Sequence, residues 1–216
     1  MTKKALLLVP LILFALAVQP AVATPITLSL GVANSDIAGY TGPYGTVTIS
    51  LSGNVATATF TALDGGGYHY LFGDGGSVAL NVNATTFTSG TITGSDQPQS
   101  PNRTPEFTVG QGGVDGFGSF NFKVDNFDGY QNSVRTVTFT LTNTSGTWSS
   151  ENDVLTANAE GYLAGAHIFV ANGDYTSNPS TGYAANGTTS VPDGGMTMTL
   201  LGLALAGMGM VARRFR

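Results

Sequence analysis

Apolar and polar side chains alternate one by one along several short stretches of this 216-residue chain. In FNFKV, at 120–124, the two phenylalanines and the valine fall on one side of an extended backbone, and the asparagine and the lysine fall on the other. In TVTFTLT, at 136–142, threonine alternates with valine, phenylalanine and leucine, and the stretches at 46–51 and 55–63 repeat this scheme. A period of two is typical of strands with one buried and one solvated face, as in antiparallel sheets. The alternation therefore predicts an antiparallel all-β fold.

Turn-forming residues separate the predicted strands. Asp–Gly or Gly-rich groups occur at 64–67, 73–76, 115–118 and 128–130, and a polar stretch with two prolines occupies 95–102. Thirty glycines and a charged fraction of only 10% suit strands and turns better than helices. Roughly eight to ten short strands with this spacing predict a β-sandwich of jelly-roll or immunoglobulin-like type. We expect this domain to extend from residue 24 to residue 174.

The end of the predicted domain contains both helix and strand signals. Ser150 precedes Asp153 by three residues, an arrangement that caps a helix, although two glycines later in the segment argue against a long one. HIFVA, at 167–171, is typical of a strand. The segment at 175–190 is rich in Ser, Thr, Asn and Gly, and we expect a flexible linker there.

The N-terminus has the three parts of a secretory signal peptide. Two lysines near the start precede an apolar run of 14 residues at 5–18, which is too short to span a membrane. Ala21 and Ala23 then supply the small-x-small pattern that a signal peptidase requires. These features predict a cleavable signal peptide over 1–23, export across the inner membrane, and Thr24 as the first residue of the mature protein.

The C-terminus carries an uncharged run that ends in a basic cluster. The run of 17 residues at 196–212 would be about 25 Å long as a helix, near the lower limit for crossing a bilayer. Three of the last four residues are Arg213, Arg214 and Arg216. Under the positive-inside rule these arginines stay cytoplasmic, so the body of the protein lies on the other side of the membrane. A buried core helix, the alternative interpretation, has no need of such a cluster.

The segment at 191–216 resembles the C-terminal sorting signal of exosortase substrates, the PEP-CTERM proteins and their VPDSG-CTERM relatives. The resemblance rests on the spanning run, the basic tail and a short signature made of Val191, Pro192, Asp193, Gly194 and Gly195. The signature has Gly194 where the VPDSG form has serine, which leaves the exosortase subtype open. The resemblance implies processing by an exosortase, a transient membrane anchor, and delivery to the cell envelope, the cell surface or an exopolysaccharide matrix.

Charge and cysteine content exclude two classes of function. Between residues 24 and 190 the chain has twelve acidic residues and only three basic ones, which gives a formal charge of −9. Such a body repels nucleic acid, whose binding depends largely on basic contacts to phosphates. The absence of cysteine excludes disulfides, zinc thiolates and thiol nucleophiles.

Catalytic residues are not marked by any motif. His69 and His167 are the only histidines, and neither lies in a recognisable catalytic motif. The sequence also has no G-x-S-x-G nucleophile elbow to supply a serine nucleophile. The body has three glutamates, Glu106, Glu151 and Glu160. Nothing in the sequence around them marks two of them as the general acid and general base of a glycosidase. We therefore expect no catalytic site and no cofactor.

A calcium site is the strongest metal hypothesis that the sequence offers. Asp125, Asn126 and Asp128 supply oxygen ligands close together. In an EF-hand loop aligned on Gly129, however, the last ligand position is occupied by Arg135, so the motif fails. Asp–Gly turns that close hairpins explain these residues more simply. The sequence thus predicts no metal site.

Aromatic residues near the turns are candidates for stacking against sugars, although we expect most of them in the core. They are Tyr40, Tyr44, Tyr68, Tyr70, Tyr130, Trp148, Tyr162 and Tyr183. Two functional hypotheses follow. The first is a non-enzymatic envelope or extracellular-matrix protein, structural or adhesive, associated with exopolysaccharide and biofilm. The alternative is a polysaccharide-binding module delivered to the cell surface by the same route.

Overall fold

The computed structural model describes residues 24–126 and 129–187, and within these ranges the chain is built almost entirely from strands. Two single-turn 3-10 helices, η1 (Tyr130–Asn132) and η2 (Glu151–Asp153), interrupt them. The strands are β1 (Ile26–Ala33), β2 (Gly45–Ser52), β3 (Val55–Ala62), β4 (Asp64–Gly65), β5 (Tyr68–Phe72), β6 (Asp74–Leu80), β7 (Phe87–Ser89), β8 (Thr93–Ser95), β9 (Thr108–Gly113), β10 (Ser119–Asn126), β11 (Thr136–Asn143), β12 (Ala164–Ala171) and β13 (Ser180–Asn186). The predicted all-β fold is confirmed.

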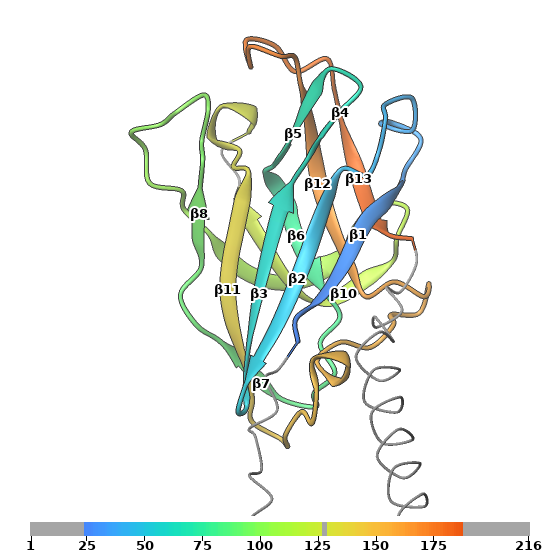
Figure 1. The fold of residues 1–216 in the computed structure, drawn as a ribbon, viewed down its shortest axis with the longest axis vertical. Coiled ribbons are helices and arrows are strands. Elements are labelled where there is room, and N and C mark those ends of the chain that lie inside the picture. The colour runs from blue at the N-terminus through green and yellow to red at the C-terminus, as the bar shows by residue number, and fades with distance from the viewer. Residues whose placement is uncertain (1–23, 127–128, 188–216) are drawn as a thin grey trace, which may run out of the picture.

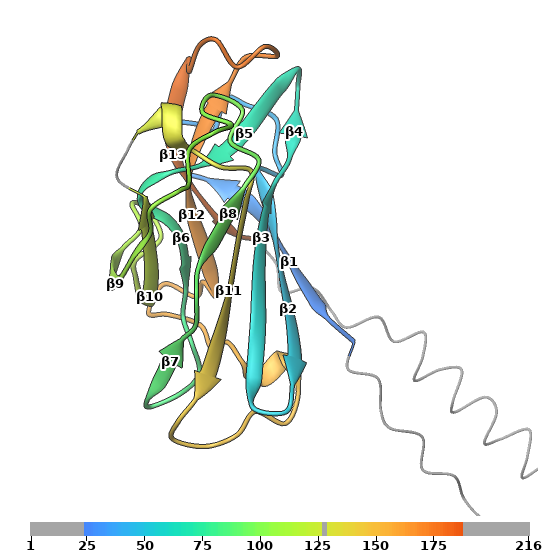
Figure 2. The same ribbon diagram turned by 90° about the vertical axis from the view of Figure 1, so that its left-hand side faces the viewer.

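Hydrogen bonds connect the strands into one antiparallel sheet that curls into a half-barrel (Figures 1 and 2). Its main order is β7-β11-β3-β2-β1-β13-β12-β6-β10-β9, with β4, β5 and β8 paired beside this path. The curl brings the two ends of the sheet face to face. Phe122 on β10 and Phe139 on β11, which are not neighbours in the sheet, have ring centroids 4.9 Å apart. One continuous core fills the space between them.

The alternation in the sequence corresponds directly to burial in β2, β3 and β11. Along β11 every second residue is buried, and Val137, Phe139 and Leu141 point into the core. The threonines between them are half-buried on the opposite face, where Thr138 donates a hydrogen bond to Thr59 on β3 at 3.3 Å. Cross-strand threonine pairs of this kind stabilise a sheet modestly, so this face needs no ligand to explain it.

Strand β12 departs from the expected pattern because all eight of its residues are buried. Ala166, Ile168 and Val170 belong to the main core, whereas His167 and Phe169 lie on the outer side of the sheet. Three chain segments cover that outer side: the β9–β10 turn, η1 through Tyr130, and the connection between β12 and β13. A strand buried on both faces has a near-continuous apolar sequence, as GAHIFVA does.

The predicted linker is wrong for residues 180–186, which form the central strand β13 between β1 and β12. Ala184 and Ala185 are fully buried there. Small side chains are required by close packing: a Cβ on Gly182 would lie 2.6 Å from Oδ1 of Asn34. A composition that is typical of a flexible stalk thus reflects tight contact between segments, and the domain extends to Asn186.

The predicted helix start at Ser150 gives only the single turn of η2. Ser150 makes no side-chain hydrogen bond to the backbone of that turn, and its hydroxyl instead bonds to Oδ2 of Asp153 at 3.1 Å. The strand predicted at 167–171 is confirmed as part of β12.

Both ends of the described chain lie away from the turns between β4 and β5 and between β12 and β13 (Figure 1). Leu30 on β1 pairs with Asn186 at the end of β13, so the first and last described strands are neighbours. Within residues 24–126 and 129–187 no helix is long and apolar enough to span a bilayer. The predicted spanning segment at 196–212 lies outside these ranges.

Candidate functional site

Polar side chains gather in two regions of the described domain. One, which we call the loop-end cluster, consists of Asp64, His69, Arg135 and Tyr175 at the end of the half-barrel that carries the β4–β5 hairpin. The other, which we call the β9 depression, lies where β9, β10 and the residue after β6 come together. Of the residues in these two regions, only His69 was a catalytic candidate from the sequence, and no motif marked either region.

The loop-end cluster is organised around one carboxylate oxygen. Oδ1 of Asp64 lies 2.8 Å from Nδ1 of His69 and accepts a hydrogen bond from Nη2 of Arg135, also at 2.8 Å. Nη1 of Arg135 donates to the hydroxyl of Tyr175 at 2.9 Å. Because these residues come from β4, β5, the segment before β11 and the β12–β13 connection, the network ties four parts of the chain together.

Tyr175 is fixed from several directions. Its ring stacks on His69 with centroids 4.4 Å apart and an interplanar angle of 11°. The hydroxyl of Tyr130 donates to its backbone carbonyl at 2.9 Å. Its φ of 59° lies in the left-handed region, which a residue with a bulky side chain rarely adopts. Sequence reasoning missed this residue, because it falls in the segment predicted to be a linker.

The charges in the loop-end cluster stabilise one another. Burial opposes ionisation of Asp64, but the hydrogen bond from His69 and the charge of Arg135 outweigh it and lower the pKa of this carboxyl. Burial likewise works against the charge of Arg135, and Tyr175 and Asp64 outweigh it and raise the pKa of the guanidinium. A second carboxylate, Asp96, lies 3.9 Å from Nε of Arg135. The single cation is thus surrounded by acceptors.

The Asp64–His69 pair resembles the base-orienting half of a catalytic triad, but its second nitrogen faces no nucleophile. Nε2 of His69 lies 3.3 Å from the backbone carbonyl of Gly173. Within the described ranges no hydroxyl is hydrogen-bonded to this nitrogen, and a triad requires one. The geometry fits a structural pair that holds the β12–β13 connection in place.

His167 occupies a different environment on the outer side of β12. It is 7% exposed, its Nε2 lies 2.7 Å from the hydroxyl of Thr181, and its ring stacks on Tyr183 with centroids 4.5 Å apart. Burial lowers the pKa of this histidine, although the charge of Asp74 and the Gly73 carbonyl act in the opposite direction. His167 is therefore a neutral, packed side chain that lies apart from the loop-end cluster.

The residues of the calcium hypothesis are engaged in other contacts. Asp125 lies 3.2 Å from Nζ of Lys123 and accepts a hydrogen bond from the backbone of Gly76. The side chain of Asn126 donates to the carbonyl of Asn132. Asp128 lies outside the described residues. In the described part of the chain no three His, Asp or Glu side chains are grouped as a metal would require.

The three glutamates come from separate places. Glu151 is buried in η2, Glu160 lies against Gly118, and Glu106 is exposed in the segment before β9. Glycosidic acid and base groups must flank one bond at a defined separation. Because the three glutamates come from separate segments and Glu151 is buried, the arrangement gives no support to a glycosidase.

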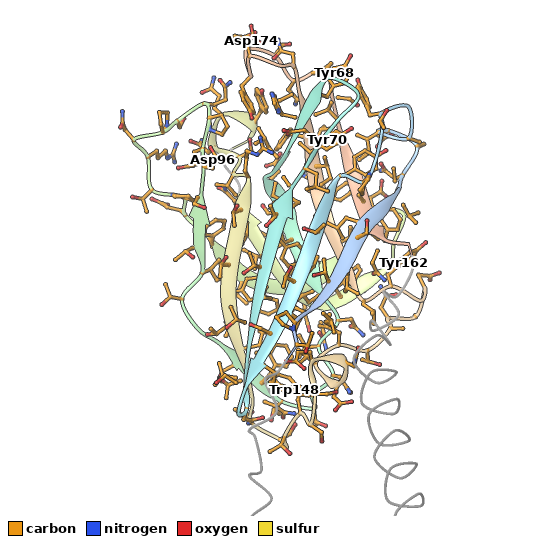
Figure 3. The ribbon with its side chains drawn as sticks, in the orientation of Figure 1. Tyr68, Tyr70, Asp96, Trp148, Tyr162 and Asp174 are labelled. Carbon is orange, nitrogen blue, oxygen red and sulfur yellow. The ribbon has the colours of Figure 1, made fainter. Side chains whose placement is uncertain are left out.

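Of the aromatic candidates, Tyr44, Tyr70 and Trp148 are core residues whose polar atoms bond to the backbone. The others are half-buried: Tyr40, Tyr68, Tyr130, Tyr162 and Tyr183. Figure 3 shows them spread over the molecule, with Tyr68 near the loop end, Tyr162 at one side and Trp148 at the far end. Burial raises the pKa of Tyr70 to about 12, as expected for a phenol enclosed by other rings. The candidates do not form one common platform.

The β9 depression is open, has a volume of about 440 Å³, and is lined by neutral residues only: Asn81, Gln111, Gly112, Ser119, Phe120 and Asn121. The amide of Asn121 bonds to both the N–H and the carbonyl of Val82, at 2.7 and 2.8 Å. Gln111 and Ser119 are exposed, and their side chains make no hydrogen bond to any described residue. We call the less exposed lining residues Asn81, Phe120 and Asn121 the floor, and the exposed Gln111 and Ser119 the rim. Hydrogen bonds hold the floor in place, whereas the rim has unused polar groups.

The predicted processing residues cannot be placed in either region. Ala21 and Ala23 lie outside the described residues, as do Val191, Pro192, Asp193, Gly194, Gly195, Arg213, Arg214 and Arg216. Thr24 is the first described residue, and it is exposed. Comparison of the chain with known protein families, with curated proteins and with solved structures found no match.

Proposed function

We propose that this protein is an exported, non-enzymatic component of the cell envelope or extracellular matrix, with a structural or adhesive role in association with exopolysaccharide and biofilm. The observation that carries the non-enzymatic part is the loop-end cluster. Its one Asp–His pair faces a backbone carbonyl instead of a nucleophile, and its one cation is shared among acceptors. No cofactor or metal takes part in this function.

The proposed route to the cell surface rests on the two ends of the sequence. A signal peptidase cleaves after Ala23, and an exosortase acts near Val191–Gly195 while the segment at 196–212 holds the chain in the membrane. The arrangement of the domain is compatible with this route: β1 and β13, which carry the described ends of the chain, are neighbours, and the loop end lies away from residues 24 and 187 (Figure 1). The domain itself is proposed to be a β-sandwich of jelly-roll or immunoglobulin-like type.

Intact-mass measurement of the protein recovered from the cell surface tests this route. The mature form should begin near Thr24 and should lack the residues after the signature. Replacement of Arg213, Arg214 and Arg216 by glutamine should leave precursor unprocessed, because the stop and orientation signal is gone. A surface form that still ends in ARRFR contradicts the sorting signal and makes the tail a plain anchor.

A polysaccharide-binding module is the second candidate function, and the β9 depression favours it. Free neutral donors and acceptors at Gln111 and Ser119 suit hydroxyl groups of a sugar. The two functions are separated by measuring binding of the purified protein to exopolysaccharide from the producing cells. Release of sugars or cleavage of esters in such an assay contradicts the non-enzymatic proposal.

A further inference from the structure

The β9 depression differs from the rest of the domain surface in its electrostatics. The body has a formal charge of −9, yet none of the six lining residues is ionisable. The nearest cation, Lys123, is paired with Asp125 at 3.2 Å, and its Nζ lies 3.9 Å from where a Cβ on Gly112 would be. An anionic ligand is repelled by the body and finds no free positive charge at this site, and a metal ion finds no carboxylate. The chemistry that remains is that of a neutral, hydroxyl-rich ligand.

The floor of the depression is pre-organised. Asn121 is held by two hydrogen bonds to Val82, and the side chain of Asn81 donates to the carbonyl of Thr156 at 3.1 Å. Phe120, which also lines the depression, is 2% exposed. Because these side chains are ordered before any ligand arrives, the conformational entropy lost on binding is confined to the exposed side chains of Gln111 and Ser119. The volume of about 440 Å³ falls within the range of about 300–1,000 Å³ for small-molecule sites.

The wall formed by β9 adds backbone groups. β9 is the last strand of the sheet, so its outer edge has no partner strand among the described residues. Gly112 has a φ of 149°, in the region that favours glycine, and leaves the backbone beside Gln111 without a covering side chain. At Gly112, which lines the depression, a ligand hydroxyl can therefore approach the backbone closely, beside the two free side chains.

We propose that the β9 depression binds one uncharged sugar unit of a neutral polysaccharide, with Gln111 and Ser119 as its hydrogen-bonding side chains. This inference deepens the second candidate function and rests on it. The site is open, which fits an internal unit of a long polymer, because the chain must enter and leave the depression. The amide of Gln111 both donates and accepts, as does the hydroxyl of Ser119, so together they match a sugar's hydroxyl groups.

Affinity gel electrophoresis of the purified protein tests the proposal with three soluble polymers: dextran and galactomannan, which are neutral, and alginate, which is acidic. We expect binding to at least one neutral polymer and none to alginate. Combined replacement of Gln111→Ala and Ser119→Ala should weaken that binding about tenfold through the loss of two neutral hydrogen bonds. Ser119→Trp, which fills the depression, should abolish it.

The matched control is Thr108→Ala. Thr108 is an exposed polar residue of β9 that does not line the depression. The control variant should bind the polymers as the unaltered protein does. All variants should retain the melting temperature of the unaltered protein. If the double variant and Ser119→Trp bind the polymer as tightly as the unaltered protein does, the location of the site is overturned, but the binding function stands. Binding to alginate alone overturns the neutral chemistry and again leaves that function standing. Binding to none of the three polymers, nor to exopolysaccharide from the producing cells, removes both.

Discussion

The loop-end cluster and the β9 depression show two opposite ways in which polar side chains are used in this domain. In the loop-end cluster, Asp64 and Arg135 satisfy one another and bring Tyr175 into the network. In the β9 depression, the side chains of Gln111 and Ser119 make no hydrogen bond in the described part of the chain. A charged network that is internally satisfied stabilises the fold, whereas unpaired neutral groups beside a rigid floor are available to a ligand. The more conspicuous cluster of side chains is therefore the structural one.

The largest expected effect is the loss of stability in Arg135→Ala. This change removes hydrogen bonds to Asp64 and Tyr175 and one to the carbonyl of Ala62. Because the side chain of Arg135 is 20% exposed and bonds to a charged partner, we expect a decrease of about 2–3 kcal/mol in the free energy of unfolding. Denaturation in urea measures it. Arg135→Lys should be intermediate, since lysine keeps the charge but not the planar fork. A loss below about 0.5 kcal/mol would mean that the cluster is not structural.

Asn121→Ala should have the next largest effect, and it examines the floor of the depression. Val82 is 1% exposed, and without the amide its N–H and carbonyl lose their side-chain partner. An unsatisfied buried backbone group costs about 1–3 kcal/mol, and we expect a loss in this range by urea denaturation. Asn121→Asp, which keeps an acceptor for the Val82 N–H but lacks the donor, is the matched comparison. Wild-type stability in Asn121→Ala would show that the floor is not pre-organised.

A smaller effect should appear on mild acidification, through His167. The pKa of this histidine is lowered by burial from its ordinary value of 6.5. Below that value the unfolded chain binds more protons than the folded one, so stability falls as the pH drops from about 7 towards the folded pKa. Melting curves at pH 8, 7, 6 and 5 should show this decline, and His167→Gln should reduce it. The pKa of Asp64 is lowered as well, but from 3.8, so the loop-end cluster contributes to acid lability only at lower pH. An unchanged pH dependence in His167→Gln would contradict this assignment.

The smallest expected effect is that of Gln111→Ala and Ser119→Ala on stability. Both side chains are exposed and make no hydrogen bond to any described residue, so each change should alter the free energy of unfolding by less than about 0.5 kcal/mol. Denaturation in urea under the conditions used for Arg135→Ala provides the comparison. A loss of 1 kcal/mol or more would place these residues in the structural class and remove the distinction between the two regions.

Strand content was predictable because alternation is a local property. In β11 each side chain occupies the face that its position along the strand assigns to it, and the sequence shows that period without knowledge of the partner strands. In β10 the predicted face is wrong for Phe120, because the register shifts between Phe120 and Lys123 and Phe120 packs in a different cluster from Phe122 and Val124. The same reasoning failed for β13. Its alanines and Gly182 are small because Asn34 and neighbouring strands press against them, and a composition of this kind is identical to that of a flexible segment.

Neither polar region was predictable from the sequence, for a related reason. Asp64 and His69 are five residues apart, but Arg135 and Tyr175 join them only through the way the strands are arranged. Gln111 and Ser119 meet because β9 and β10 form a hairpin in which Ser119 pairs with Gly113. No spacing rule links residues whose proximity depends on the register between strands.

The sequence by itself determined the all-β class, the absence of cysteine chemistry, the acidic body and the expectation of export and sorting, because each of these depends on local periodicity or on composition. Only the tertiary structure decided which polar residues satisfy one another and which remain free. That distinction depends on distances of about 3 Å between segments far apart in the chain, and hydrogen bonds form or fail at that scale. It is also what separates the proposed ligand site at β9 from the structural cluster at the loop end.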